Sequence, residues 1–262
     1  MDPGVSMKIF ILVDFEGASG VFHESQVFGH RQKEGLRGLY SDVNAILDGA
    51  RDGGADELVV GDWHAFGGNL ELSFLSQKCQ LTQYADRGIL HKERFDMAFF
   101  VGAHARAGLD AVLAHTEEFF IANVWINHQP VGETTLVYHY LNDLGIPVGG
   151  VIGAGEALDE IRHNPNGTAL VETKRGFAGP EPAQTYPLIR QAVQMAVTGR
   201  RAKQVKSQKP LFVVEYRHKH NYRPEKLPTG ITVLDGKQIC MDGPSIGGCY
   251  ELLMQLLCGE TQ

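Results

Sequence analysis

Three apolar runs in this chain are each followed closely by acids or histidines, and this pattern limits the fold more than any other feature. The runs cover residues 8–13, 57–61 and 97–102. Short continuous apolar runs are typical of strands that are buried on both faces of a parallel sheet. Apolar residues with helical spacing over 36–52 separate the first two runs. The chain therefore predicts strands that alternate with helices, the pattern of an α/β fold.

The rest of the chain extends this alternation. Further helices are expected over 133–144, 182–197 and 245–257, and further strands over 119–126, 146–152, 169–174, 210–216 and 231–234. We predict an α/β fold with a mostly parallel central sheet flanked by helices, and a second, smaller α/β domain. Asn and Pro cluster at 163–167, which places the boundary at about residue 165.

Charge and composition argue against several classes of function. The 262 residues include 24 basic and 31 acidic side chains, a formal net charge of -7, which argues against nucleic acid as the main partner. No apolar stretch approaches the roughly 20 residues of a membrane helix. The N-terminus lacks the pattern of a secretory signal. The four cysteines form no C-x-x-C pair, so we expect reduced thiols in a cytoplasmic protein.

The predicted strand ends bring acids and imidazoles to one edge of the sheet. The carboxyl ends of parallel strands meet at a single edge, where α/β proteins bind their ligands. Asp14 and Glu16 are two residues apart, so they project to one side of an extended backbone. Asp62 and His64 repeat this spacing after the second strand, and His104 follows the third. We expect Asp62 to orient a ligand imidazole.

A further acid, Glu133, opens the helix expected at 133–144 and completes a set of ligands for two divalent ions. If Asp14 bridges, one ion receives Asp14, Glu16 and His64, and the other receives Asp14, His104 and Glu133. Three protein ligands per ion leave a position for water or substrate, as catalytic sites do. Nitrogen and oxygen ligands without thiolate favour zinc, and they also accept manganese or cobalt.

Several segments between residues 7 and 160 resemble the DppA-type zinc D-aminopeptidases. The matching segments are V-D-F-E-G-A-S-G at 13–20, D-W-H at 62–64, V-G-A-H-A-R-A at 101–107, His115, and I-N at 126–127 through V-G-E at 131–133. By this resemblance the family's metal ligands fall on Asp14, Glu16, His64, His104 and Glu133, and its catalytic histidine falls on His115. The resemblance also implies a two-domain α/β subunit and a ring-shaped homo-oligomer, a pentamer or decamer.

The expected function is a two-metal hydrolase that cleaves amide or peptide bonds of small substrates. In this interpretation residues 7–165 form the metal-binding catalytic domain, and residues 166–262 form the smaller domain that completes the pocket and supports oligomerisation. In that family the catalytic histidine is described as a nucleophile. An imidazole has an unperturbed pKa near neutrality, so proton transfer or stabilisation of the oxyanion suits His115 at least as well.

Three departures from the family pattern concern the substrate, and one of them is the pair Glu117-Glu118, which is unusual after His115-Thr116. The family often carries acids after the strand that corresponds to 148–152, where this chain has Gly153-Ala154-Gly155-Glu156, and it commonly has an acid at the position of His128. A buried ammonium is costly without an anionic or carbonyl partner. We therefore expect weaker binding of a free amine and wider acceptance of other amides, such as lactams.

Three alternative functions fit the same residues. One is an amidase or lactamase that acts on a small non-peptide amide. A second is a two-metal phosphoesterase, which needs Lys or Arg beside the metals; Arg106 is the only nearby candidate in the sequence. The third is a binding module stabilised by metal, which would unfold when the metal is removed.

Overall fold

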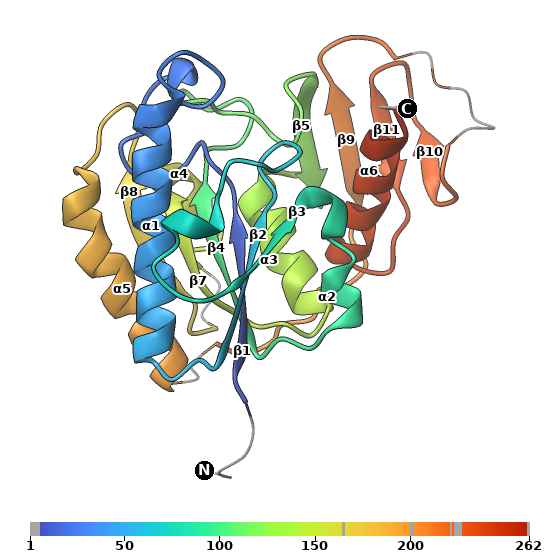
Figure 1. Cartoon of the computed structure of the whole chain (residues 1–262). Coiled ribbons are helices and arrows are strands. Elements are labelled where there is room, and N and C mark those ends of the chain that lie inside the picture. Colours follow the sequence, from blue (N-terminus) through green and yellow to red (C-terminus); the bar gives the residue numbers. More distant parts are fainter. Residues whose placement is uncertain (1–5, 164–165, 200–201, 221, 223–226, 261–262) are drawn as a thin grey trace.

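The computed structural model describes residues 6–163, 166–199, 202–220, 222 and 227–260, and it contains two β-sheets with helices packed around them (Figure 1). The larger sheet is entirely parallel, with the order β3-β2-β1-β4-β7-β8. Its strands are β1 (Lys8–Val13), β2 (Glu57–Asp62), β3 (Gln80–Gln83), β4 (Met97–Ala103), β7 (Val148–Ala154) and β8 (Ala169–Lys174). The predicted α/β class is confirmed.

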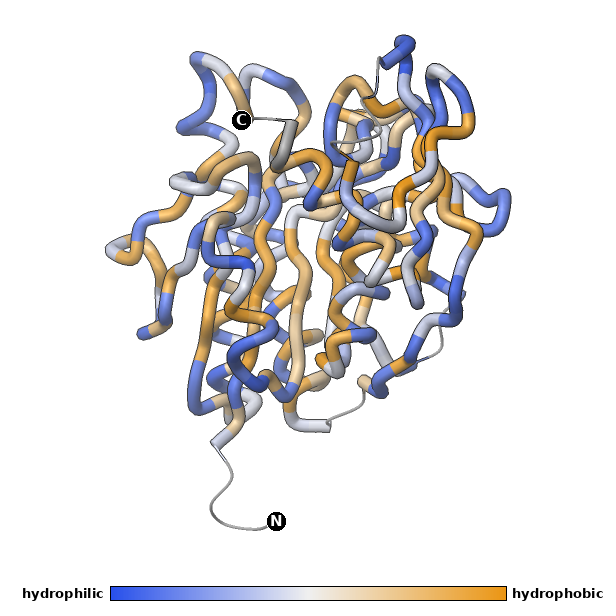
Figure 2. The backbone as a smooth tube through the Cα atoms, turned by 90° about the vertical axis from the view of Figure 1, so that its right-hand side faces the viewer, coloured by the Kyte–Doolittle hydropathy of each residue, from blue (hydrophilic) through white to orange (hydrophobic). Residues whose placement is uncertain are grey.

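Alternate residues of the central strand β1 face two different apolar cores. Its odd-numbered residues from 9 to 13 pack in one core with α1 (Gln32–Asp52) and α5 (Pro182–Gly199). Its even-numbered residues 10 and 12 pack in the other core with α3 (Glu133–Asp143). Figure 2 shows the hydrophobic colour concentrated along the inner strands, as expected for a parallel sheet covered on both faces.

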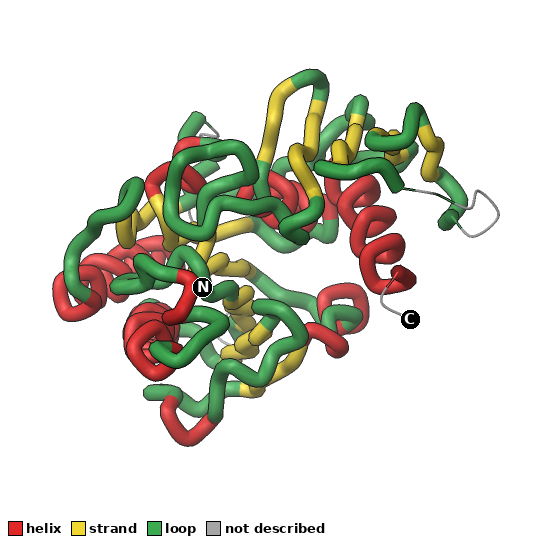
Figure 3. Tube along the Cα trace, turned by 90° about the horizontal axis from the view of Figure 1, so that it is seen from above, coloured by secondary structure: helices red, strands yellow, loops and turns green. Residues whose placement is uncertain are grey.

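The smaller sheet is antiparallel and lies beside the larger one (Figure 3). Its order is β10-β11-β9-β5-β6, with β5 (Ile121–Ile126), β6 (Gln129–Val131), β9 (Phe212–Tyr216), β10 (Ile231–Val233) and β11 (Gln238–Met241). Helix α6 (Ile246–Glu260) packs on this sheet, and α3 packs against α6. Helix α3 therefore contributes to the cores of both sheets, with Leu136 in the smaller one and Leu141 in the larger one.

The two sheets do not divide the chain at residue 165. Strands β5 and β6 precede that residue but belong to the smaller sheet, whereas β8 and α5 follow it and belong to the larger layer. The reason is that β8 and α5 continue the alternation of parallel strands and covering helices. Residues 164 and 165 lie outside the described residues. The division into units of 7–165 and 166–262 remains a prediction about how the chain folds.

Several short elements were not predicted from the sequence. They are β3, β6, β11, the helices α2 (Ile89–Lys92) and α4 (Gly155–Asp159), and the 3₁₀ turns Glu24–Gln26, Leu72–Phe74 and Tyr84–Asp86. Among the described residues, no helix combines the length and the apolar character needed to cross a bilayer. The four cysteines, all within the described part of the chain, form no disulfide.

Candidate metal centre

The strand order brings the predicted ligands together, because β1 lies between β2 and β4. The Asp14 amide donates to the Val101 carbonyl at 2.9 Å, and the Trp63 amide donates to the Val13 carbonyl at 3.1 Å. The three strands thus stay paired up to the residues that carry the acids and imidazoles. Asp14, Glu16, His64 and His104 all follow directly from this edge of the sheet.

A glycine allows the ends of β1 and β4 to approach closely. The Gly17 amide donates to the Gly102 carbonyl at 2.8 Å. A Cβ atom at Gly17 would lie 1.9 Å from the Ala103 carbonyl oxygen, far inside van der Waals contact. Gly102 itself has a φ of +82°, a backbone conformation that glycine adopts without penalty. The G-A-S-G turn therefore serves close packing beside the ligands.

Two buried charged side chains, Lys174 and Asp42, hold this turn in place through hydrogen bonds to the backbone in it and beside it. Lys174 donates to the backbone carbonyls of Glu16 and Val21, and burial lowers the pKa of its amine to about 7. The Asp42 carboxylate accepts the Ser19 amide at 2.7 Å. Burial raises the pKa of Asp42 to about 6, although its hydrogen bonds oppose that shift.

The two oxygens of the Asp14 carboxylate face two different histidines. Oδ1 lies 3.1 Å from Nδ1 of His64, and Oδ2 lies 3.4 Å from Nε2 of His104. Nδ1 of His64 is also 3.0 Å from Glu16 Oε2, and Nε2 of His104 is 3.2 Å from Glu133 Oε1. The arrangement therefore has two halves that share Asp14, as a bridging carboxylate requires.

These separations suit ligands around metal ions. Bonds of about 2.0 Å in a tetrahedral zinc site place ligand atoms roughly 3.3 Å apart. Asp14 Oδ2, Glu16 Oε2 and His104 Nε2 are buried and have no hydrogen-bond partner. Ligand atoms of Asp14, Glu16 and His104 all lie within 4.8 Å of one another, as do those of His104, His115 and Glu133. Unpartnered polar atoms that converge in this way fit a divalent ion.

The charges in the cluster favour a bound cation. Burial lowers the pKa of His64, but the adjacent carboxylates of Asp14 and Glu16 outweigh that effect and raise the pKa to about 10. Burial opposes ionisation of Asp14, yet His64 and His104 hold the pKa of that carboxyl well below its usual range. Protons on the histidines and divalent ions therefore compete for the same positions, so ion binding weakens at low pH.

His104 and His115 each present one free ring nitrogen. Nδ1 of His104 lies 3.1 Å from the Ala105 carbonyl, and Nδ1 of His115 lies 2.8 Å from the Leu113 carbonyl. A carbonyl oxygen only accepts, so each Nδ1 carries the proton and each Nε2 is left to bind a metal or a proton. The two rings are stacked at 4.2 Å, and His115 Nε2 is 3.9 Å from Glu133 Oε1.

Asp62 does not have the role that was predicted for it from the sequence. Its carboxylate accepts the amides of Asn69 and Leu70 and the side-chain amide of Asn69. The same Asn69 side chain donates to the carbonyl of His64. Asp62 therefore holds the loop that follows β2 and supports the backbone of His64. The expectation that it orients an imidazole is wrong, because its oxygens are directed to the loop.

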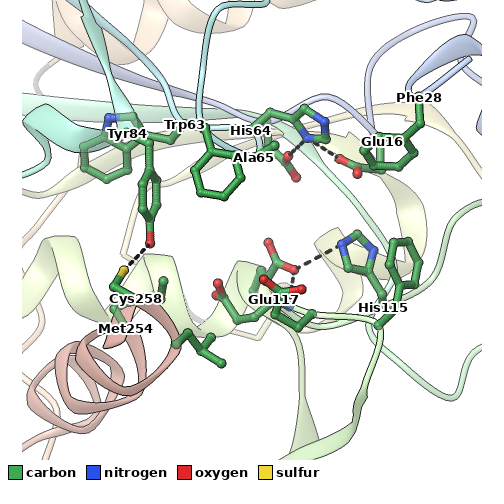
Figure 4. A pocket seen from close by; sticks show the side chains of 16 residues that line it. Glu16, Phe28, Trp63, His64, Ala65, Tyr84, His115, Glu117, Met254 and Cys258 are labelled. Carbon is green, nitrogen blue, oxygen red and sulfur yellow. Dashed lines mark hydrogen bonds and ion pairs between the residues drawn. The ribbon is translucent and has the colours of Figure 1, made fainter. Parts of the chain in front are cut away.

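A pocket of about 300 Å³ opens onto the cluster (Figure 4). Its walls combine acids with aromatic and apolar side chains from the segments between strands, from the start of α3 and from α6. The lining residues are Asp14, Glu16, Phe28, Trp63, His64, Ala65, Phe66, Tyr84, His115, Glu117, Glu118, Phe119, Glu133, Met254, Leu257 and Cys258. No Lys or Arg is among them in the described part of the chain. Arg106 hydrogen-bonds the Ala107 carbonyl and does not line the pocket.

Sequence reasoning gave no role to one pocket acid, Glu117. Its φ of +59° is rare for a residue with a side chain. Its amide donates to Glu133 Oε1 at 2.6 Å, so its backbone positions a predicted ligand. Burial, together with the nearby charge of Glu133, raises the pKa of Glu117 well above its ordinary value. The adjacent acids at 117 and 118 were the only sequence signal.

Two of the three departures from the family pattern lie away from this pocket within the subunit, whereas Glu117 and Glu118 line it. His128 stands at the tip of the β5–β6 hairpin, where its φ is +68°. Glu156 accepts the amide of Gly176 at 2.7 Å. Neither residue lines the pocket, so within the subunit they give no support to the expectation of weak amine binding.

Comparison with known proteins identifies the family. A family model described as D-aminopeptidase matches residues 7–255. The chain belongs to the D-aminopeptidase family. A curated D-aminopeptidase from Bacillus subtilis (strain 168) is 30% identical over 176 residues, which is 64% of this chain and 64% of that relative. The alignment thus spans less than two thirds of the relative's length.

A solved D-aminopeptidase structure has the same fold. It is the zinc-dependent D-aminopeptidase DppA from Bacillus subtilis, described as a self-compartmentalizing protease. The TM-score is 0.85 at 21% sequence identity, and the match covers 98% of each chain. The resemblance inferred from the motifs is confirmed, and so is the fold that it implied for a D-aminopeptidase.

Proposed function

We propose that this D-aminopeptidase family member is a two-metal hydrolase that cleaves the amide bond after the first residue of small peptides or aminoacyl amides. The observation that carries the proposal is the Asp14 carboxylate, whose two oxygens face His64 and His104 separately. With Glu16 and Glu133 each half offers three protein ligands, which leaves room for water or substrate. The family to which the chain belongs supports the same class of reaction.

Zinc is the ion that we propose for both positions. The donors are imidazole nitrogens and carboxylate oxygens, which suit zinc, manganese or cobalt. The Bacillus subtilis protein with the same fold is described as zinc-dependent, which favours zinc. When bound, such ions polarise a carbonyl group and lower the pKa of water toward neutrality.

His115 is proposed to carry the proton to the departing amine. Its Nδ1 is committed to the Leu113 carbonyl, so Nε2 faces the cluster as the exchanging atom. The ring is held between His104 at 4.2 Å and Phe119 at 4.5 Å, which fixes its plane. An imidazole positioned in this way suits proton transfer. In this mechanism the residue is neither a nucleophile nor the main stabiliser of the oxyanion.

The pocket favours a small amide over a phosphate ester. Its volume of about 300 Å³ accepts a small molecule. Five carboxylates line it and no Lys or Arg does so among the described residues, whereas phosphate recognition relies on such cations. Aromatic and apolar walls suit an uncharged substrate side chain. We also propose that the chain forms a closed homo-oligomer, because the relative with this fold is self-compartmentalizing.

Metal analysis combined with turnover tests the proposal. The chain should bind about two divalent ions per subunit and hydrolyse D-aminoacyl amides. His64→Ala and His104→Ala should each lose about one ion and nearly all activity, because each histidine serves one half of the site. The exposed His163 offers a matched control, and His163→Ala should keep both ions. Full ion content and turnover in the two site variants would rule the site out.

A further inference from the structure

Glu117 carries a carboxylate that nothing in the proposed reaction uses. It lines the pocket beside the cluster (Figure 4). Its Oε1 is buried and has no hydrogen-bond partner. The side chain of Tyr250, from α6, lies close to the same carboxylate. One oxygen of Glu117 is therefore left without a donor, and a buried carboxylate in this condition is costly.

The backbone at Glu117 holds this acid next to the metal cluster. Its amide bonds to Glu133 Oε1 at 2.6 Å, and its left-handed φ turns the chain there. Strained backbone of this kind persists where the surrounding structure enforces it, commonly at functional sites. Among the described residues, the compact sets of ligand atoms do not include Glu117. Those sets leave out His64 as well, but Glu117 contacts the predicted ligand Glu133 through its backbone amide, so its carboxylate is left for another partner.

A positively charged donor would complete the environment of Glu117. Ions in the cluster would offset its charge in part, but Oε1 would still lack a hydrogen-bond donor. An ammonium group supplies three N–H donors and a positive charge. In an aminoacyl substrate a single carbon separates the ammonium from the scissile carbonyl carbon, so its partner must stand next to the metals. Glu117 meets this requirement, whereas Glu118 is exposed at the rim.

We propose that Glu117 binds the α-ammonium group of the substrate and makes the enzyme selective for a free amino terminus. This inference rests on the proposed amide hydrolysis at the same site. The aromatic rings of Phe28, Trp63 and Phe119 line the same pocket. They favour substrates whose first side chain is apolar, and their faces also attract a cation. The preferred substrates are therefore small aminoacyl amides or peptides with a free amine and an apolar first residue.

The test compares one amide with and without its free amine. We would measure kcat and KM for leucyl p-nitroanilide, in both enantiomers, and for its N-acetylated counterparts. Wild type should prefer the free amine. In Glu117→Gln this preference should fall about 10- to 100-fold, mainly through KM, as expected when a hydrogen bond between charged groups is lost. Metal content should stay the same, and Glu117→Asp should recover part of the preference.

Glu118→Gln is the matched control, because it removes a neighbouring acid from the rim of the same pocket. It should leave the preference for the free amine unchanged. An equal loss for both substrates in Glu117→Gln would show a role in proton transfer and overturn the inference. Loss of metal in that variant would overturn it as well, because Glu117 would then be a ligand.

A binding measurement separates this inference from the proposed hydrolysis. Calorimetry with isoamylamine and isoamyl alcohol on the metal-loaded protein requires no turnover. Wild type should bind the amine more tightly than the alcohol, and Glu117→Gln should lose that difference. If wild type shows the difference but hydrolyses neither amide, the hydrolytic function fails while the ammonium site stands. If wild type binds the two compounds equally, the ammonium site is refuted.

Discussion

At the scale of single residues, His115 is held in two ways. Its Nδ1 keeps the proton that it donates to the Leu113 carbonyl, and its ring is stacked between the rings of His104 and Phe119. His115→Ala should keep both ions bound and lower kcat by about 10²–10⁴-fold, the usual cost of a lost proton-transfer group. Metal analysis and steady-state kinetics on the same preparation check this. An ion lost along with the activity would make His115 a ligand, as its closeness to His104 and Glu133 allows.

Asp42 gives stability a pH dependence that can be assigned to one carboxyl. Its pKa rises from 3.8 to about 6 in the fold. Between these values the native state keeps a proton that the unfolded state has lost, so stability falls as pH rises through this window. The contribution is about 3 kcal/mol, from about 1.4 kcal/mol per tenfold change in proton affinity.

Asp42→Asn removes this contribution while leaving an oxygen to accept the Ser19 amide. Denaturant unfolding of both proteins from pH 4 to pH 7 should show wild type losing stability relative to the variant as pH rises to about 6. A constant difference across this range would mean that the buried carboxyl does not titrate there.

The sequence was enough to predict which side chains gather at the candidate metal site. Asp14 and Glu16, and likewise Asp62 and His64, are two residues apart after predicted parallel strands, and His104 follows a third such strand, so the ends of these strands bring them to one edge of the sheet. Glu117 could not be assigned a role in the same way. Its position depends on a left-handed residue in an irregular loop, and no periodicity marks that conformation.

At the scale of elements, the approach of β1 to β4 depends on Gly17. Gly17→Ala would place a methyl group 1.9 Å from the Ala103 carbonyl. Because backbone must move to admit it, the variant should lose about 1–3 kcal/mol of stability, typical of overpacking, and should bind metal poorly. Gly88→Ala is the control, since a Cβ there meets nothing within 4 Å. Equal stability and metal content in the two variants would contradict this account.

Long elements were predictable and short ones were not. The helices α1, α3, α5 and α6 show apolar residues at helical spacing, and β1, β2 and β4 are continuous apolar runs. Strand β6 has only three residues, too few to show a strand pattern in the sequence. It follows a turn at Asn127 and His128, both with positive φ. Short antiparallel strands obtain their stability from neighbours that are distant in the sequence.

At the scale of the whole molecule, the metals are expected to serve the reaction more than the fold. The main cores are apolar and extend well beyond the cluster. Chelation should abolish activity, keep the circular dichroism of the folded chain, and lower Tm. The stabilisation lost is about 4 kcal/mol for free ion at a thousand times Kd. Added zinc should restore turnover. Unfolding on chelation would instead support the binding-module alternative.

The composition of the pocket is a property of the whole chain that local patterns did not reveal. Met254, Leu257 and Cys258 reach it from α6, more than a hundred residues after the last predicted ligand. The apolar face of α6 predicted a helix, but not which part of the larger sheet it would approach. This explains why the sequence predicted a metal site but left the substrate-binding surface undefined.

Helix α3 has a consequence that follows from its two sets of neighbours. It starts with Glu133 at the proposed metal site, and it ends at Asp143, whose carboxylate accepts the Gly247 amide at the start of α6. With ions bound as proposed, we expect the position of α6 and the affinity for metal to be coupled through this one helix. Such coupling is reciprocal: a change that tightens the packing of α6 should raise metal affinity, and bound metal should resist the detachment of α6.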